Sequence, residues 1–187
     1  MILYSGITLY HGSYALVEAP DLAMCSPYKD FGKGFYLTTS KRQAAAFVKS
    51  AVAKAKRRGE LQRDISFGYV SKYRFKPLEE AQIYEFEGAD VQWLHCVAAH
   101  RRGDTSLFPG EEWANYDILA GKVANDRTNP TITAYLSGLF GEIGTGQADG
   151  RCIEMLLPDQ LENQICLRTE RALSCLVFEG SEKIVWQ

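Results

Sequence analysis

Two short segments concentrate the residues that could bind a flat, polar ligand. The first is Leu9–Ser13, which reads LYHGS, and the second is Phe31–Thr38, which reads FGKGFYLT. An imidazole and a hydroxyl can hydrogen-bond a ligand, and a glycine lets the backbone approach it closely. A tyrosine ring can stack on a cationic ring, which stabilises binding by about 0.5 to 2 kcal/mol. Together the two segments predict a ligand-binding site.

Other kinds of site are not supported by the pattern of residues. Gly32 and Gly34 form a G-x-G without the third glycine of a dinucleotide fingerprint, and no G-x-x-x-x-G-K-[ST] phosphate loop occurs. His95 and His100 lie roughly 140° apart around a helix, so they do not form a pair of metal ligands. The five cysteines never form a C-x-x-C pair. We therefore expect no metal, no disulfide framework and reduced thiols.

The composition is that of a globular protein with little net charge. The chain has 187 residues, of which 46% are hydrophobic and 24% are charged, and its formal net charge is -2. A duplex-binding protein usually carries a clearly basic face, which this balance does not favour. No apolar stretch approaches the roughly 20 residues that cross a bilayer, and the first residues lack the pattern of a signal peptide. We expect a cytoplasmic protein without a membrane segment.

Strands and a helix must position the two motifs. We expect strands at Ile7–Tyr10 and Gly34–Thr38. Ser40 and Gln43 form a capping box, and apolar residues then recur with helical spacing until Gly59. The last turn of this helix is basic, which suits the negative end of a helix dipole. The pattern therefore predicts a strand, a loop, a second strand and a long helix.

The rest of the chain mixes strands and helices irregularly. The expected strands are Gly68–Phe75 and Ile83–Phe86, which we expect to pair, and then Tyr116–Val123 and Gln164–Arg168. The expected helices are Asp90–Arg101, a helix from Asn129-Pro130 whose apolar face includes Leu139 and Phe140, a short helix near Arg151–Leu157, and Glu170–Leu176. This order predicts an α+β fold rather than a doubly wound parallel sheet. We expect one domain over residues 1–187, in which about residues 60–128 are a candidate helical and strand insert.

The ordered motifs resemble those of the ADP-ribosyltransferase superfamily. The resemblance is to the branch with a His, a Tyr and a third residue, usually Glu, which includes the diphtheria toxin type and the poly(ADP-ribose) polymerases. There the first strand ends in Y/W-H-G-[ST] and the second carries G-x-G-[IVLF]-Y-[FL], as both do here. The nearest resemblance, from Leu9 to about Leu176, is to an uncharacterised bacterial family of toxin-like proteins with LYHGS, KDFGKGFYLT, VAND and NQI-TERAL motifs. It implies a split antiparallel β-sheet core with flanking helices.

The resemblance implies that NAD is the substrate and that each motif residue has a role. His11 would bond a ribose hydroxyl of the adenosine half, the Gly12 backbone would take both ends of the nicotinamide amide, and Ser13 would add a hydroxyl contact. Tyr36 would stack on the nicotinamide. Phe47 stands eleven residues later on the predicted helix, at the spacing of a second aromatic that closes the sandwich.

The third residue of this branch is where the sequence departs from the usual pattern. At the matching place, the start of a late strand, Gln164 stands instead of Glu. An amide oxygen can accept the ribose hydroxyl bond but carries no charge, and removing one electrostatic stabiliser commonly lowers a rate about 10²- to 10³-fold. We rank Gln164 first for this role and Glu170 second, with Glu162 as a further nearby carboxylate.

The resemblance implies a mono-ADP-ribosyltransferase that cleaves the nicotinamide–ribose bond of NAD and transfers ADP-ribose to a macromolecule, either protein or nucleic acid. The nearest family further implies a bacterial toxin or effector with a small antitoxin protein as partner. Several alternatives stay open: an NAD glycohydrolase, transfer to a phosphorylated RNA end, a catalytically weak NAD- or ADP-ribose-binding module, and an interaction protein without a nucleotide site.

Each candidate also has a purely structural interpretation. His11 can be a turn histidine bonded to backbone, Tyr36 a half-buried strand residue, and Phe47 part of the apolar face of a helix. Lys29 and Asp30 either border a pyrophosphate or form a plain turn. No role can be derived for three polar residues of the VAND segment, which otherwise form a loop: Asn125, Asp126 and Arg127.

Overall fold

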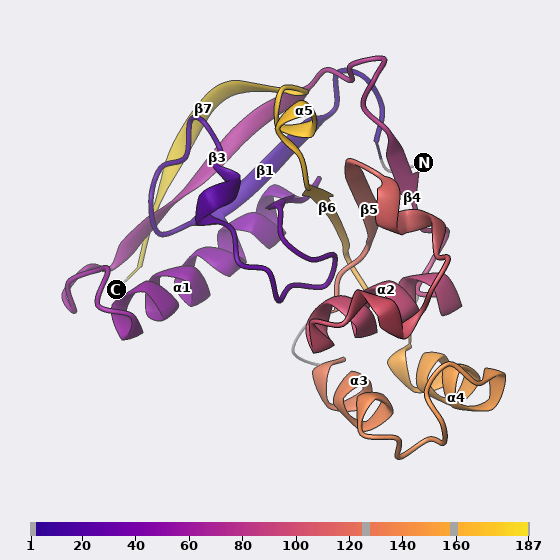
Figure 1. Cartoon of the computed structure of the whole chain (residues 1–187). Coiled ribbons are helices and arrows are strands. Elements are labelled where there is room, and N and C mark those ends of the chain that lie inside the picture. Colours follow the sequence, from indigo (N-terminus) through magenta and orange to yellow (C-terminus); the bar gives the residue numbers. More distant parts are fainter. Residues whose placement is uncertain (1–2, 125–127, 158–160, 187) are drawn as a thin grey trace.

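The computed structural model describes residues 3–124, 128–157 and 161–186, which form an α+β fold (Figure 1). The strands are β1 (Thr8–Ser13), β2 (Phe35–Leu37), β3 (Phe67–Phe75), β4 (Ile83–Glu85), β5 (Ile118–Lys122), β6 (Asn163–Leu167) and β7 (Leu176–Val185). The helices are α1 (Lys41–Arg57), α2 (Val91–Arg102), α3 (Asn129–Leu136), α4 (Gly146–Leu156) and α5 (Glu170–Leu173). The predicted α+β class is therefore confirmed.

The strands form two sheets. The first is antiparallel with the order β1-β3-β7, and the second has the order β2-β6-β5-β4, in which β4 and β5 run parallel. Within the described residues, the two sheets are joined by an isolated bridge between Tyr10 and Thr38, whose backbone hydrogen bonds measure 2.8 and 3.0 Å. The sheets meet at this bridge and separate beyond it.

Helix α1 packs on β1 and β3 and forms one wall of the space between the sheets. Ser40 caps its first turn as predicted, because its hydroxyl accepts the Gln43 N–H at 3.2 Å. The reciprocal bond of a capping box is not formed, because the Ser40 N–H donates to the Thr38 hydroxyl at 3.0 Å. The buried residues of this helix are Ala44, Val48, Val52 and Ala55. Gly12 permits the close packing, since a Cβ there would lie 2.1 Å from the Ala44 carbonyl oxygen. The glycine of the first motif therefore has a packing role whatever else it does.

Two strand predictions are wrong. β3 and β4 do not pair with each other, because β3 lies between β1 and β7 while β4 pairs with β5 in the other sheet. The intervening segment crosses between the sheets: Lys76 N–H bonds Cys175 O at 2.7 Å, and Asp117 N–H bonds Gln82 O at 3.0 Å. Strand β7 is absent from the prediction. Its sequence is LVFEGSEKIV, in which Glu179–Lys183 separate the apolar residues, so its hydrophobic periodicity is too weak to identify a strand.

The helix expected from Asn129 is shorter than its apolar pattern indicates. Thr128 is its N-cap, so Asn129 and Pro130 both lie in its first turn. The helix ends at Leu136, and Leu139 is 73% exposed beyond its end. The residues after the helix form a turn, so their side chains no longer follow helical spacing.

The last two helices also differ from the prediction. α4 begins at Gly146, five residues before the expected start near Arg151, because the Thr145 hydroxyl accepts the Ala148 N–H at 3.4 Å and caps it. α5 ends at Leu173 instead of continuing to Leu176, where β7 begins. A capping hydroxyl thus outweighs the low helix propensity of glycine at the start of α4.

Helices α2, α3 and α4 lie together on the side of the second sheet away from β7 (Figure 1). Their core includes the fully buried side chains of Trp93, Trp113 and Tyr135. The segment of residues 60–128 supplies β3 to the first sheet and β4 and β5 to the second. Among the described residues no helix combines the length and apolar character needed to cross a bilayer.

Candidate functional site

A cavity of about 1230 Å³ lies where the two sheets separate beside α1. Most of the residues selected from the sequence line it: His11, Gly12, Ser13, Tyr36, Phe47 and Gln164. The register explains part of this convergence, because Tyr36 pairs with Cys166 across β2 and β6. Residues two apart in a strand share a face, so Tyr36 and Gln164 project from the same side of the second sheet.

His11 joins the diverging strands through its side chain. Its Nδ1 lies 2.7 Å from the Tyr36 carbonyl oxygen. Because a carbonyl only accepts, Nδ1 must carry the hydrogen, which leaves Nε2 as an acceptor when the ring is neutral. Burial lowers the pKa of His11, and the backbone bond to Tyr36 offsets part of this effect. The ring packs on Phe35 with centroids 4.3 Å apart, so His11 is a neutral, fixed imidazole at the cavity wall.

The backbone of Gly12 offers a donor and an acceptor toward the same cavity. Along a strand, alternate residues direct their N–H and C=O groups to the same edge. Tyr10 uses both groups for Thr38, so those of Gly12 also face the β2 side. Within the described residues, the pairing to that side ends at Tyr10 and Thr38. Gly12 therefore presents an unpaired N–H and C=O that match the two polar ends of a primary amide.

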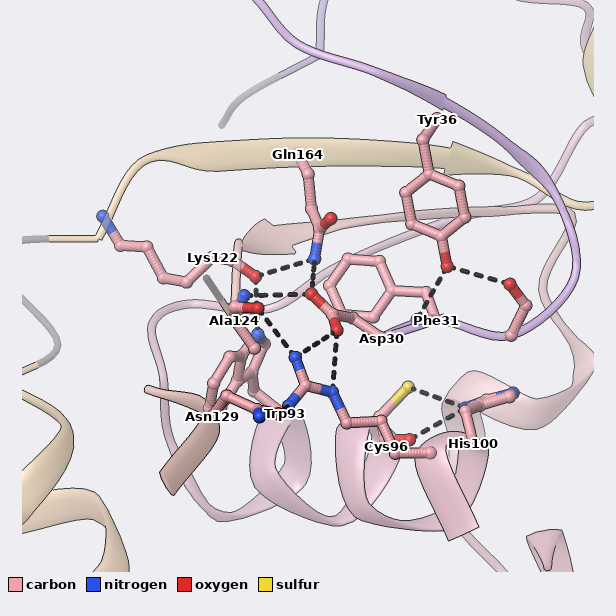
Figure 2. Close-up of polar contacts among 12 residues, drawn as sticks. Asp30, Phe31, Tyr36, Trp93, Cys96, His100, Lys122, Ala124, Asn129 and Gln164 are labelled. Carbon is pink, nitrogen blue, oxygen red and sulfur yellow. Dashed lines mark hydrogen bonds and ion pairs between the residues drawn. The ribbon is translucent and has the colours of Figure 1, made fainter. Parts of the chain in front are cut away.

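Tyr36 is held in place through its hydroxyl. The hydroxyl donates to the Gly32 carbonyl oxygen at 2.9 Å and accepts the Phe31 N–H at 2.8 Å (Figure 2). Burial, followed by the nearby Cys166, raises the pKa of Tyr36 well above its ordinary value. The phenol therefore stays neutral at physiological pH. With the hydroxyl occupied by backbone groups, the ring face is the part of Tyr36 that can serve a ligand.

Phe47 lies on the opposite wall, on α1. Its side chain is 45% exposed and lines the cavity. It is not among the buried residues of the helix. The interpretation that Phe47 only completes the buried apolar face of α1 is therefore wrong. Its ring also lies 5.5 Å from the Lys54 ammonium nitrogen, which places an aromatic and a cation together at the cavity.

Gln164 is 7% exposed and anchored by its amide nitrogen. Its Nε2 donates to Asp30 Oδ2 at 2.9 Å and to the Lys122 carbonyl oxygen at 3.2 Å. Its oxygen accepts no hydrogen bond from the described residues, and it is not among the buried polar atoms without a partner. Figure 2 shows this oxygen turned toward the side on which Tyr36 lies. Gln164 thus has a free acceptor at the cavity.

Sequence reasoning missed the residue that holds Gln164. Asp30 is 9% exposed, and its carboxylate pairs with Arg101 of α2 at 2.8 Å. The interpretation of Asp30 as part of a plain turn is therefore incomplete. A sequence signal was available, since Asp30 directly precedes the apolar Phe31 at the start of the FGKGFYLT segment. Arg101 offered no such signal because a basic residue in the last turn of a helix is common.

Four cationic side chains line the cavity: Lys29, Lys54, Arg58 and Arg101. Arg101 pairs with Asp30, and Arg58 pairs with Glu60 at 2.7 Å. The pKa of Lys29 is lowered by desolvation and then by the positive charge of Lys54, while Asp30 raises it. These cations crowd one another, so this part of the cavity favours an anionic group.

The remaining candidates lie in different places. Ser13 lines the cavity, and its hydroxyl accepts the Ala15 N–H at 3.4 Å. Glu162 also lines the cavity, 4.0 Å from Arg42. The structure does not bring Glu170 to the cavity, because it is exposed at the start of α5. The loop residues Asn125, Asp126 and Arg127 lie outside the described residues.

The fold and site define an α+β protein with a ligand-sized cavity between two sheets and a neutral polar site at its wall. In the part of the chain that the structure describes, no group of three or more His, Cys, Asp or Glu side chains is arranged to hold a metal. Residues 7–178 match the family described as Protein of unknown function (DUF3990), and the chain belongs to this family. No curated protein matches the chain.

Proposed function

We propose that this protein is an NAD-dependent mono-ADP-ribosyltransferase with the split-sheet core of that superfamily. The observation that carries the proposal is the unpaired N–H and C=O of Gly12 at a cavity also lined by His11, Tyr36 and Gln164. The two sheets that meet at one bridge are consistent with a split-sheet core. The order of the LYHGS and FGKGFYLT motifs along the chain supports the same proposal.

The chemistry of the cavity suits nicotinamide at one end of NAD. A carboxamide offers an N–H donor and a carbonyl acceptor, which complement the backbone C=O and N–H of Gly12. Tyr36 presents an aromatic face, and a pyridinium ring on such a face is favoured by about 0.5 to 2 kcal/mol. Phe47 lines the same cavity and would cover the other face of the ring.

The other residues suit the sugar and phosphate parts. The free Nε2 of His11 would accept a hydrogen bond from a ribose hydroxyl of the adenosine half. The uncharged oxygen of Gln164 would accept one from the ribose that reacts. Lys29 and Lys54 would face the diphosphate, because they are the lining cations not paired with a carboxylate among the described residues.

In the proposed reaction, the bond between the ribose C1′ and the pyridinium nitrogen breaks. Its electron pair goes to nitrogen, so nicotinamide leaves neutral and positive charge develops on the ribose. A nucleophile of the macromolecular acceptor then bonds to C1′ and releases a proton to solvent. Gln164 stabilises the developing charge only through a dipole, so we expect slower turnover than in ADP-ribosyltransferases whose site is built around a charged glutamate.

Nicotinamide release from NAD tests this function. We expect release that rises when a cell lysate supplies acceptors and that falls about 10²-fold or more in His11→Ala and Gln164→Ala. Glu170→Ala is the matched control, because Glu170 is exposed and lies outside the cavity.

The products separate the related activities. Radiolabel from the adenine half should appear on a macromolecule, whereas free ADP-ribose alone would identify an NAD glycohydrolase. NAD binding without release would identify a binding module, which the uncharged Gln164 makes a second candidate. A protein that neither binds NAD nor releases nicotinamide would contradict the proposal.

A further inference from the structure

The carboxylate of Asp30 sits at the centre of a hydrogen-bond network beneath the cavity (Figure 2). Its Oδ1 accepts from Arg101 Nε at 3.0 Å and from Arg101 Nη2 at 2.8 Å. Its Oδ2 accepts from the Ala124 N–H at 3.0 Å and from Gln164 Nε2 at 2.9 Å. Both carboxylate oxygens are therefore occupied, and one of their partners is the residue proposed to face the reacting ribose.

Arg101 offsets the cost of burying the Asp30 carboxylate and is itself hydrogen-bonded to two further segments of the chain. Its guanidinium donates to the Ala124 carbonyl oxygen at 2.7 Å and to Asn129 Oδ1 at 2.9 Å. A buried charge is costly unless it is paired and hydrogen-bonded. The pair of Asp30 and Arg101 meets this condition, and Asp30 accepts from Gln164 as well.

This arrangement dictates which way the Gln164 amide points. Asp30 Oδ2 and the Lys122 carbonyl oxygen both accept hydrogen bonds and cannot donate them. The NH2 end of the amide must therefore face them, and the carbonyl oxygen must face away, into the cavity. Without Asp30 one of these two acceptors is lost, and the reversed amide becomes less unfavourable.

We propose that Asp30, held by Arg101, is a positioning residue that fixes the Gln164 amide with its oxygen toward the ribose, and that it makes glutamine the working residue at position 164. The inference rests on the proposed function. A glutamate at this position would bring a second carboxylate to within hydrogen-bond distance of Asp30. Two carboxylates so close do not both ionise readily, so they share a proton. Gln164 is therefore matched to Asp30 and is not a degraded glutamate.

The decisive experiment is the pH dependence of nicotinamide release by Gln164→Glu. At about pH 8 we expect its kcat to be about 10²-fold below that of the unchanged protein, because the like charges displace the side chain. As the pH falls toward about 5.5, the shared proton lets the new carboxyl group donate to Asp30 and present its carbonyl oxygen, so the ratio to the unchanged protein rises. A kcat at about pH 8 equal to or above that of the unchanged protein would overturn the inference, as would a ratio that stays constant with pH.

Other groups that face Asp30 bear on this titration. They are Lys29 beside it, Tyr36 of β2, Cys96 and Arg101 of α2, and Cys166 of β6. All of them are unchanged in Gln164→Glu. A pH response that appears in this variant and is absent from the unchanged protein therefore belongs to the new pair of carboxylates.

Asp30→Asn tests the positioning directly. We expect its kcat to fall about 10²-fold while KM changes less than about threefold, since the amide is misplaced but the rest of the cavity remains. The matched control is Asp117→Asn. Asp117 is also a buried carboxylate paired with an arginine, Arg171 at 3.1 Å, but it lies outside the cavity. Asp117→Asn should lose stability and keep its kcat per folded molecule. An equal fall of kcat in both variants would show that Asp30 has only a structural role.

A measurement without substrate separates this inference from the proposed function. The side-chain NH2 signals of Gln164 can be assigned by NMR, because they vanish in Gln164→Glu. We expect them to exchange slowly with solvent in the unchanged protein, to shift and exchange faster in Asp30→Asn, and to stay unchanged in Asp117→Asn. Signals that do not respond to Asp30→Asn would overturn the positioning role. This readout holds even if the protein releases no nicotinamide. If Asp30→Asn folds poorly, the pH dependence of nicotinamide release by Gln164→Glu still tests the inference, since that variant keeps the Asp30–Arg101 pair.

Discussion

Two buried polar networks each include a residue of α2, Arg101 in the cavity network and His95 in the helical network. They differ in whether a polar atom remains available to a ligand. In the cavity network, Asp30 accepts from Arg101, from the Ala124 N–H and from Gln164. The amide of Gln164 also donates to the Lys122 carbonyl oxygen. The oxygen of that amide is left without a protein partner among the described residues and borders the cavity. The cavity network thus ends in an acceptor that a ligand can use.

The helical network is closed. His95 of α2 lies 2.8 Å from Glu111 through Nδ1 and 3.0 Å from Asp149 of α4 through Nε2. The Tyr135 hydroxyl of α3 donates to Asp149 at 2.5 Å. The Phe108 ring stacks on the imidazole with centroids 3.8 Å apart. Within the described residues, each side chain of this network has at least one polar partner inside the protein.

The comparison teaches that burial and charge alone do not identify a functional site. Both networks contain a buried carboxylate and a cationic or basic partner. Only the cavity network directs a free polar atom at a ligand-sized space. We therefore assign chemistry to Gln164 and its neighbours, and a structural role to His95 in tying α2 to α4.

Removing His95 should produce the largest effect on stability. His95→Ala removes the shared partner of the buried Asp149 and the half-buried Glu111, which is expected to lower the free energy of unfolding by about 3 to 5 kcal/mol. Urea unfolding measures this, with Arg102→Ala as an exposed control on the same helix. Nicotinamide release per folded molecule should be unchanged. A loss of nicotinamide release per folded molecule in His95→Ala would contradict the assignment of a structural role to His95.

A smaller effect is expected from Tyr36→Phe, which separates the ring from its hydroxyl. The change leaves the Phe31 N–H and the Gly32 carbonyl without their partner, so the free energy of unfolding should fall by about 1 to 3 kcal/mol. NAD affinity should fall less than in Tyr36→Ala, because the aromatic face remains. Calorimetric titration checks this, with Tyr69→Phe as a control on β3 outside the cavity. Equal losses of affinity in both Tyr36 variants would contradict the stacking role.

The smallest effect concerns the response of stability to acid. Burial lowers the pKa of His11 and of His100 in the folded protein. As the pH falls, these histidines are therefore protonated in the unfolded chain before they are protonated in the folded protein. The contribution of the neutral histidines to stability is present above about pH 6.5 and is lost as the pH falls below it. Urea midpoints between about pH 7.5 and about pH 5 should show this decline. His11→Gln should flatten it in part, and an unchanged slope would show that His11 is not held neutral by burial.

Local patterns were enough to predict several elements correctly. Ser40 and Gln43 marked the start of α1, and regular apolar spacing marked its length. The motif residues His11 and Tyr36, and the more distant Gln164, do meet at one cavity. The prediction of α1 depends on interactions between residues close in sequence. What His11, Tyr36 and Gln164 do at the cavity stays a prediction.

The failures in strand pairing and in the placement of Phe47 involve partners distant in sequence. The pairing of β4 with β5 and of β7 with β3 depends on which sheet each strand joins, and short or weakly periodic strands do not encode that choice locally. The placement of Phe47 at the cavity is a second example, because helical spacing fitted a buried position equally well.

The amino-acid sequence by itself determined the α+β class, the capped helix α1, and the presence of an imidazole, a glycine, a tyrosine and a glutamine in the motif positions. Only the tertiary structure decided how those groups are oriented. It brought Asp30 against Gln164, 134 residues away, and Arg101 against Asp30. A hydrogen bond between such distant residues depends on the packing of whole elements, because donor and acceptor must meet within about 3 Å at a favourable angle. Spacing along the chain carries no information about that meeting.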